Sequence, residues 1–181
     1  MARATHILNV PIIGQKTDFA CGNTCLAAVL QYHRVFVSAD KLAELAGTLE
    51  TGTDHANLVD AAEKCGLSAY AESGTIDDLV AYLDRGLPVV VGWWSMDKGD
   101  KHYDASWTLE KREKRDCGHY SVLHGYTPTK LLFMDPQDGG DGKTIGSCKK
   151  SDRDFLRVWY DTDTDDYHRV DNWFLVVEPK R

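Results

Sequence analysis

The chain lacks the features of a membrane protein or of a secreted disulfide scaffold. No run of about 18 or more apolar residues occurs in its 181 residues, so the sequence predicts no membrane span. The segment Met1–Pro11 contains no continuous apolar stretch, so no secretory signal is expected. The 5 cysteines are odd in number and unevenly spaced, which does not suit a disulfide framework. We therefore expect a cytoplasmic protein with reduced thiols.

Positive charge is also scarce. The chain has 21 Lys and Arg against 28 Asp and Glu, which gives a net charge of −7. Nucleic acids and anionic membranes both bind clustered basic residues, so neither is an expected partner. The sequence has no internal repeat, linker or low-complexity tract. Residues 1–181 are predicted to form a single domain, with enough apolar residues for a core.

The most informative feature that is present is a Cys-Gly pair, Cys21 and Gly22, at the start of a helix-periodic apolar run. The run predicts a helix from Cys21 to about His33. A helix N-terminus favours an anion, and it lowers the pKa of cysteine thiols in general. Gly22 is expected to leave the sulfur open to a substrate carbonyl. Gln15 lies six positions before the cysteine.

Two strand-like segments carry the partners of such a thiol. The first, His119–Tyr126, begins with a histidine, and the second, Leu131–Met134, ends just before Asp135. The turn-forming residues 127–130 between them predict a hairpin. That hairpin would fold Asp135 back toward His119.

These four residues are the parts of a thiol hydrolase. His119 would take the proton of Cys21 and deliver it to the leaving group. Asp135 would orient the imidazole and stabilise its positive charge. Gln15 would donate an N–H to the oxyanion, together with the backbone N–H of Cys21. Losing one such donor typically costs about 100- to 1,000-fold in rate.

In these motifs the chain resembles the bacteriocin-processing, double-glycine-leader cysteine peptidases, which form peptidase family thirty-nine of the papain-like superfamily. The resemblance extends over about residues 10–140 and rests on Gln15 with 18–22, on 118–122 and on 133–136. It implies an α+β fold, with an N-terminal helical half packed on a C-terminal antiparallel sheet. It implies a stand-alone cysteine peptidase with no cofactor and no metal, acting on a peptide or protein substrate. Cleavage after a small pair such as Gly-Gly is expected, and a separate transporter or precursor peptide is the expected partner.

Further helices are predicted from capping residues and glycines. Ser38 would cap a helix that ends at Gly47, and Thr53 would cap one that ends at Gly66. A Thr75–Asp78 capping box would begin the helix 76–85, and Ser151 would cap a helix from Asp152 to about Tyr160. Additional strands are expected at 67–72, 88–94 and 173–178, and the strand 88–94 ends in Trp93 and Trp94. One of these tryptophans is expected in the core and the other in the cleft.

Residues 95–118 are unusually charged and are predicted to be an insertion beside the active site, with a short helix around 106–115. Long loops of this kind often act as lids or specificity loops. Tyr103 and Trp107 are its expected apolar contacts with substrate.

Three alternatives remain open at this stage. The same Cys-His-Asp order serves acyltransferases and transglutaminase-like enzymes, and it also occurs in inactive peptide-binding relatives. A zinc or redox module of Cys21, Cys25, Cys117 and His119 has suitable ligand types, but it leaves Gln15 and Asp135 without a role.

Two features outside these motifs carry weaker expectations. The acidic run 161–166 is interpreted as a solvated loop rather than a cation site. His55 is one of six histidines without a partner pattern, and it is interpreted as a surface or satisfied side chain.

Overall fold

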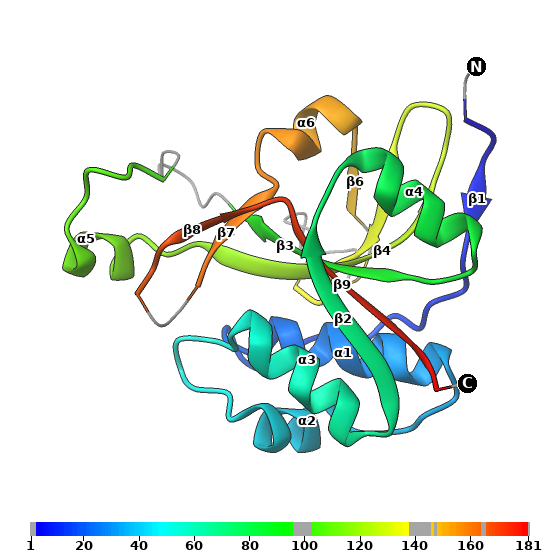
Figure 1. Ribbon diagram of the computed structural model, residues 1–181, viewed down its shortest axis with the longest axis horizontal. Helices are drawn as coiled ribbons and strands as arrows, with labels where there is room; N and C mark the ends of the chain where they lie inside the picture. Colours follow the sequence, from blue (N-terminus) through cyan, green and yellow to red (C-terminus); the bar gives the residue numbers. More distant parts are fainter. Residues whose placement is uncertain (1–2, 96–102, 138–145, 147, 164–165, 181) are drawn as a thin grey trace.

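The computed structural model describes residues 3–95, 103–137, 146, 148–163 and 166–180. It shows an α+β fold in which helices cover both faces of an antiparallel sheet (Figure 1). Figure 1 groups α1, α2 and α3 on one side of the sheet and α4 and α6 on the other. The expected packing of an N-terminal helical part against a sheet is confirmed. The helix bounds are α1 Cys21–Tyr32, α2 Ala39–Ala46, α3 His55–Lys64, α4 Ile76–Asp84, α5 Leu109–Glu113 and α6 Asp152–Leu156.

The strands of the main sheet run in the order β2-β9-β3-β4-β5-β6, and β1 pairs with β4 outside that path. Strands β7 and β8 form a separate two-stranded sheet. The strand bounds are β1 His6–Ile7, β2 Leu67–Ser73, β3 Val89–Trp94, β4 Gly118–Tyr126, β5 Leu131–Met134, β6 Cys148–Lys150, β7 Tyr160–Thr162, β8 Arg169–Asp171 and β9 Trp173–Pro179. The strands predicted from sequence are present, whereas the short strands β1, β6, β7 and β8 were not expected.

Helix α1 is buried on all sides over most of its length. Its residues from Cys21 to Leu30 are all buried. It packs against β4, α2 and α3 within one core cluster, which also contains Tyr120 and Val122 of β4. A second cluster lies between the sheet and α4 and α6, and it includes Leu79, Leu123 and Phe155. A helix that is buried on all sides belongs in a core, so the position of α1 is fixed by packing.

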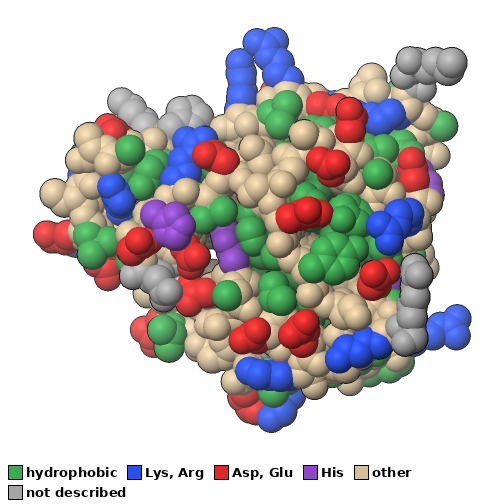
Figure 2. All heavy atoms as spheres, in the orientation of Figure 1, with side chains coloured by type: hydrophobic (Ala, Val, Ile, Leu, Met, Phe, Trp, Pro, Cys, Tyr) green, Lys and Arg blue, Asp and Glu red, His purple; other side chains and the backbone are tan. Residues whose placement is uncertain are grey.

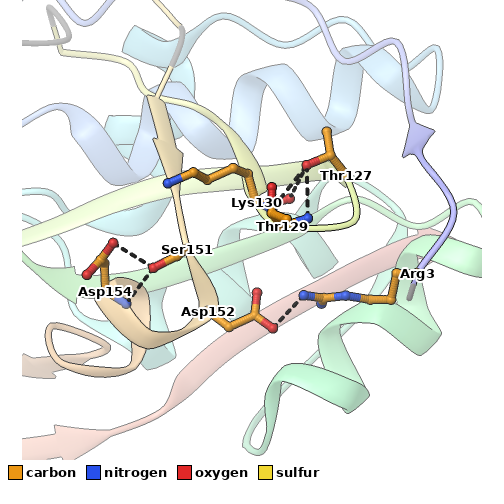
Figure 3. Close-up of polar contacts among 7 residues, drawn as sticks. All are labelled: Arg3, Thr127, Thr129, Lys130, Ser151, Asp152 and Asp154. Atoms are coloured by element: carbon orange, nitrogen blue, oxygen red, sulfur yellow. Dashed lines mark hydrogen bonds and ion pairs between the residues drawn. The ribbon is translucent and has the colours of Figure 1, made fainter. Parts of the chain in front are cut away.

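The predicted capping residues hold α2, α4 and α6 as expected. Ser38 accepts a bond from Lys41 N, and Gly47 ends α2 with φ of 63°. Thr75 and Asp78 form the full capping box of α4. Ser151 accepts a bond from Asp154 N at 3.1 Å at the start of α6 (Figure 3).

Two helix boundaries differ from prediction. Asp54, rather than Thr53, is the N-cap of α3, because the Thr53 hydroxyl is hydrogen-bonded to Thr48 Oγ1 at 2.7 Å. Helix α6 ends at Leu156 instead of near Tyr160. Tyr160 begins β7 and pairs with Asp171, so tertiary strand pairing overrides the local helical pattern.

The β4–β5 hairpin turns where it was predicted. Thr127 N donates to Lys130 O at 2.7 Å, and Lys130 N donates back to Thr127 Oγ1 at 3.0 Å (Figure 3). Arg3 forms an ion pair with Asp152 and so ties the first described residue to α6 (Figure 3).

Figure 2 shows the face of Figure 1 in space-filling form. Acidic side chains are spread over it, with Lys and Arg mainly toward its edges. Of the helices that the structure describes, none combines the length and the apolarity needed to cross a bilayer.

Candidate active site

Cys21 is the first residue of α1 and is 6% exposed. The preceding residue, Ala20, offers no side-chain cap, and the first turn contains no acidic residue. The backbone N–H groups of this turn therefore lack the side-chain acceptor that usually satisfies one of them. This leaves the helix N-terminus available to negative charge on the sulfur or on a bound carbonyl oxygen.

His119 and Asp135 meet through the β4–β5 hairpin. Val122 of β4 pairs with Met134 of β5, so Ser121 and Asp135 come next along the two chain segments. His119 Nε2 lies 2.8 Å from Asp135 Oδ1, and Ser121 Oγ donates to Asp135 Oδ2 at 3.2 Å. Gln137 N also donates to Asp135 Oδ1 at 3.0 Å. All of these side chains except Gln137 are buried, so the carboxylate is held by fixed donors.

The pKa of His119 depends on Cys21 as well as on Asp135. Burial alone would lower the pKa of His119, but hydrogen bonds to Asp135 and Cys21, with the negative charges of both, raise it to about 10. These interactions therefore favour the charged imidazolium form of His119. Because Asp135 occupies Nε2, Nδ1 is the ring nitrogen left to exchange a proton with the thiol.

Trp94 lies in the core, as was expected of one of the two tryptophans, whereas the cleft position of Trp93 stays a prediction. Trp93 is half-buried, its ring edge faces His119 at 5.4 Å, and its Nε1 donates to Ser121 Oγ at 2.9 Å. Lys150 Nζ lies 4.3 Å from the centre of the Trp93 ring. Trp94 is buried and stacks on Tyr160. Trp93 thus supports both His119 and the serine that holds Asp135.

Gln15 lies in the segment that leads into α1, next to the end of the hairpin. Its backbone N–H donates to Pro136 O at 2.8 Å, so it is tied to the residue that follows Asp135. Its side-chain Nε2 donates to Thr17 O at 2.9 Å. Its role as an oxyanion donor stays a prediction, because the amide is turned toward Thr17 in this structure.

Gly22 has a different role from the one expected. It is buried, and a Cβ at this position would lie 3.1 Å from Tyr120 Cδ2 and 3.2 Å from Leu58 Cδ1. The absent side chain therefore allows α1 to pack closely against β4 and α3. It faces the core rather than a substrate carbonyl.

A cavity of about 180 Å³ opens beside Cys21, and sequence reasoning missed both its buried carboxylate, Asp161, and the buried His55 next to that carboxylate. Asp161 of β7 is 2% exposed and lines this cavity. It forms an ion pair with His55 of α3, with Nε2 and Oδ2 separated by 3.6 Å. The interpretation of Asp161 as part of a solvated loop was wrong, because β7 carries it into the interior.

The described part of the 95–118 segment contains the expected short helix, α5. Residues 96–102 of the segment lie outside the described residues. Tyr103 packs against Trp94 and Trp107, with ring centres 6.3 Å and 6.4 Å apart. The other end of the segment, Asp116 with Gly118, lines the cavity beside Cys21. Among the described residues, no group of three or more His, Cys, Asp and Glu side chains is arranged to hold a metal ion.

Comparison with known proteins identifies relatives of this arrangement. The family model described as the Peptidase_C39 like family matches residues 7–166. Two curated relatives, both uncharacterized proteins, come from Methanothermobacter marburgensis and Methanothermobacter thermautotrophicus. They are 43% and 40% identical over 38% and 42% of this chain. The matches cover 48% and 54% of those relatives, so the chain spans about half the length of each.

Solved structures share the fold over nearly the whole chain. A putative C39-like peptidase from Bacillus anthracis superposes with a TM-score of 0.67 at 21% identity, covering 99% of this chain and 100% of that one. A double glycine motif protease from an AMS/PCAT transporter, solved in complex with the leader peptide, gives a TM-score of 0.66 at 19% identity. That match covers 98% of this chain and 100% of the other. At these identities the likeness shows the fold.

Proposed function

The chain belongs to the peptidase C39-like family, and we propose that it is a cysteine peptidase that hydrolyses a peptide bond through Cys21, His119 and Asp135. Family and fold together support a cysteine peptidase. The observation that carries the assignment of residues is the contact of 2.8 Å between His119 Nε2 and Asp135 Oδ1, in a buried histidine whose pKa Asp135 and Cys21 together raise. A histidine held in this way is the general base and acid that a thiol hydrolase needs beside its cysteine.

The proposed reaction runs in two steps. Cys21 Sγ, its proton held on His119 Nδ1, attacks the carbonyl carbon of the peptide bond and forms a tetrahedral oxyanion. His119 then gives that proton to the departing amine, and the C–N bond breaks to leave a thioester on Cys21. Water attacks the thioester with His119 as base, which releases the acid and restores the thiol. Asp135 keeps the imidazole oriented through both steps.

The oxyanion would be bound by the backbone N–H of Cys21 at the helix N-terminus and by the side chain of Gln15. Because Gln15 Nε2 donates to Thr17 O in this structure, the amide must turn when substrate enters. The fixed link from Gln15 N to Pro136 O keeps its backbone close to the catalytic hairpin during that turn.

The substrate proposed from the family resemblance is a peptide with a small pair, such as Gly-Gly, before the scissile bond. The structural relative from the AMS/PCAT transporter is itself a double glycine motif protease bound to a leader peptide. A precursor peptide, delivered with or without a separate transporter, is accordingly the partner we propose.

A thiol-directed peptide probe tests the nucleophile. Mapping of the labelled peptide by mass should place the probe on Cys21, with His119→Ala greatly reducing the labelling rate. Cys25 is a matched internal control one turn further along α1: it is fully buried, and burial with the nearby charges of Cys21 and Asp135 raises its pKa. Labelling of Cys25, or of any other cysteine, at the rate of Cys21 would refute the assignment.

A further inference from the structure

The cavity beside Cys21 is walled by acidic side chains. Asp18, Glu50, Asp116 and Asp161 all line it together with Cys21, and no lysine or arginine is among the described residues that do so. Its volume of about 180 Å³ is more than ten times the roughly 15 Å³ that holds one water. It therefore has room for a side chain of a substrate that reaches the sulfur.

The innermost carboxylate of this cavity accepts a backbone hydrogen bond, from Thr162 N to Asp161 Oδ1 at 2.8 Å, but no described residue gives it a hydrogen-bonded counter-charge. Asp161 is 2% exposed, and the nearest nitrogen of His55 is 3.6 Å from Oδ2, beyond hydrogen-bond distance. His55 is itself 6% exposed, and its Nε2 has no hydrogen-bond partner within the described part of the chain. A buried carboxylate without a hydrogen-bonded counter-charge is costly, so the site is poised for a cation.

A second carboxylate points to the same place. Asp116 Oδ1 accepts bonds from Thr162 Oγ1 at 2.7 Å and from Gly118 N at 2.9 Å, which fixes it at the rim of the cavity. Burial raises the pKa of Asp161 to about 6 and also raises the pKa of Asp116. Because both pKa values are raised, the described protein groups around these two carboxylates do not fully compensate either negative charge.

The sheet makes room for Asp161 by omitting two side chains. A Cβ on Gly92 would lie 2.7 Å from Asp161 Oδ2, and a Cβ on Gly118 would come closer still to Oδ1. Gly118 directly precedes His119 on β4. The Asp161 carboxylate thus lies against β3 and β4, and the β4 residue that it contacts, Gly118, is the neighbour of the proposed catalytic histidine.

We infer that this cavity, defined by Cys21, Asp116 and Asp161, binds the cationic side chain of a lysine or arginine of the substrate close to the scissile bond. The inference rests on the proposed function, because it assigns a subsite of the same cleft. A basic residue would satisfy the two inner carboxylates at once. The enzyme would then select its substrates by a basic residue near the scissile bond as well as by the small residues directly before that bond.

The first test uses peptides that keep Gly-Gly before the scissile bond and differ at one other position, either the third or fourth residue before that bond or the first or second after it. Lys, Arg, Gln and Glu are placed there in turn, and kcat/KM is measured with the cleavage site read from product masses. One position should favour Lys and Arg over Gln by about tenfold, with Glu the poorest, as expected for one close charge pair. Equal rates for all four residues at every position would overturn the inference while leaving the peptidase assignment intact.

Charge-matched variants locate the preference. Asp161→Asn and Asp116→Asn should each reduce the preference for Lys or Arg over Gln severalfold. Asp77→Asn, on the exposed surface of α4, changes the net charge equally and should leave the preference unchanged. Asp116→Asn is the safeguard should the more deeply buried Asp161→Asn fold poorly. A preference that survives in folded Asp116→Asn and Asp161→Asn would refute the subsite.

A second readout needs no peptide substrate. Cys21 is alkylated with cationic 2-bromoethylammonium and with anionic iodoacetate, and the ratio of the two rates is compared between variants. The ratio should fall several-fold in Asp161→Asn and Asp116→Asn relative to the parent and to Asp77→Asn. An unchanged ratio contradicts the cation subsite. A ratio that falls, in a protein that cleaves no peptide, would support the subsite and count against the proposed hydrolysis.

Discussion

At the scale of single residues, Asp135 is the most constrained group in the proposed active site. Its two oxygens receive hydrogen bonds from Ser121 Oγ and Gln137 N, and Oδ1 lies 2.8 Å from His119 Nε2. With the bond to Cys21, this pairing raises the pKa of His119 to about 10 despite its burial. An unfolded histidine titrates near 6.5, so the contribution of His119 to stability is complete below about pH 6.5 and is lost as the pH rises toward 10.

Asp135→Asn should therefore change the pH dependence as well as the rate. Without the carboxylate charge the pKa of His119 falls, so the imidazolium is lost at lower pH and the basic limb of the kcat/KM profile moves toward neutrality. The rate should fall less than in His119→Ala, which removes the acid–base group worth roughly 100- to 10,000-fold. A pH–rate profile measured beside Ser121→Ala, which keeps the charge, checks this. An unmoved basic limb would contradict the role of Asp135.

Gln15→Ala tests the oxyanion donor. Loss of one donor should lower kcat by about 100- to 1,000-fold and leave KM nearly unchanged, because the interaction strengthens only in the transition state. Steady-state kinetics with one small-residue peptide supply the measurement. Thr17→Ala is the matched control, because Gln15 Nε2 contacts only the backbone oxygen of Thr17. A change confined to KM would make Gln15 a substrate-binding residue.

At the scale of elements, the start of α1 depends on close packing rather than on a cap. Gly22 lies against Tyr120 of β4 and Leu58 of α3, and both of these side chains are buried. Tyr120 is further fixed by the bond from its hydroxyl to Thr53 O at 2.9 Å. The position of Cys21 at the helix end therefore follows from the seating of α1 on the sheet.

Gly22→Ala should lower stability and activity together. The added methyl group must displace buried atoms at 3.1–3.2 Å, and overpacking costs about 1–3 kcal/mol. The gain of about 1 kcal/mol in helix propensity offsets only part of this. Thermal unfolding and kcat/KM are measured beside Thr75→Ala, which removes the exposed cap of α4. That control should lose about 0.5–2 kcal/mol of stability and keep its activity; equal activity in Gly22→Ala would contradict the packing argument.

At the scale of the whole molecule, the segment between β3 and β4 joins the periphery to the active site. Tyr103 packs on Trp94, and the guanidinium of Arg112 lies over the Tyr103 ring. The ammonium of Lys111 lies over the ring of Trp107. These contacts hold Tyr103 against β3 and join Tyr103 and Trp107 to α5, the segment's own helix. Its last residues, Asp116 with Gly118, lead directly into the cavity beside Cys21.

Replacing residues 97–115 with a short Gly-Ser link should therefore broaden specificity or raise KM, while Cys21 still alkylates rapidly. The physical reason is that the described part of the segment leads to Asp116 at the rim of the cavity, whereas Asp135 is bonded to His119, Ser121 and Gln137, which lie outside the replaced residues. Cleavage of a panel of peptides by the shortened and parent proteins provides the comparison. If both proteins process every peptide alike, the segment is a surface addition with no part in substrate selection.

The sequence by itself determined those parts of the protein that depend on near neighbours. The caps at Ser38, Thr75 and Ser151, the extent of α1 and the β4–β5 hairpin follow from short-range hydrogen bonds and hydrophobic periodicity. The approach of Asp135 to His119 belongs to this group, because only a tight turn separates their strands. The ordered motifs around Cys21 and His119 indicated the family and the fold before any packing was known.

Only the tertiary structure decided what depends on residues far apart in the chain. Asp161 meets His55 because β7 and α3 converge beside Cys21, and no local pattern links the two positions. Gly22 proved to serve packing, since its neighbours Tyr120 and Leu58 come from other elements. The end of α6 was likewise set by the pairing of Tyr160 with Asp171. Burial and strand pairing act between distant segments, so local propensity cannot specify them.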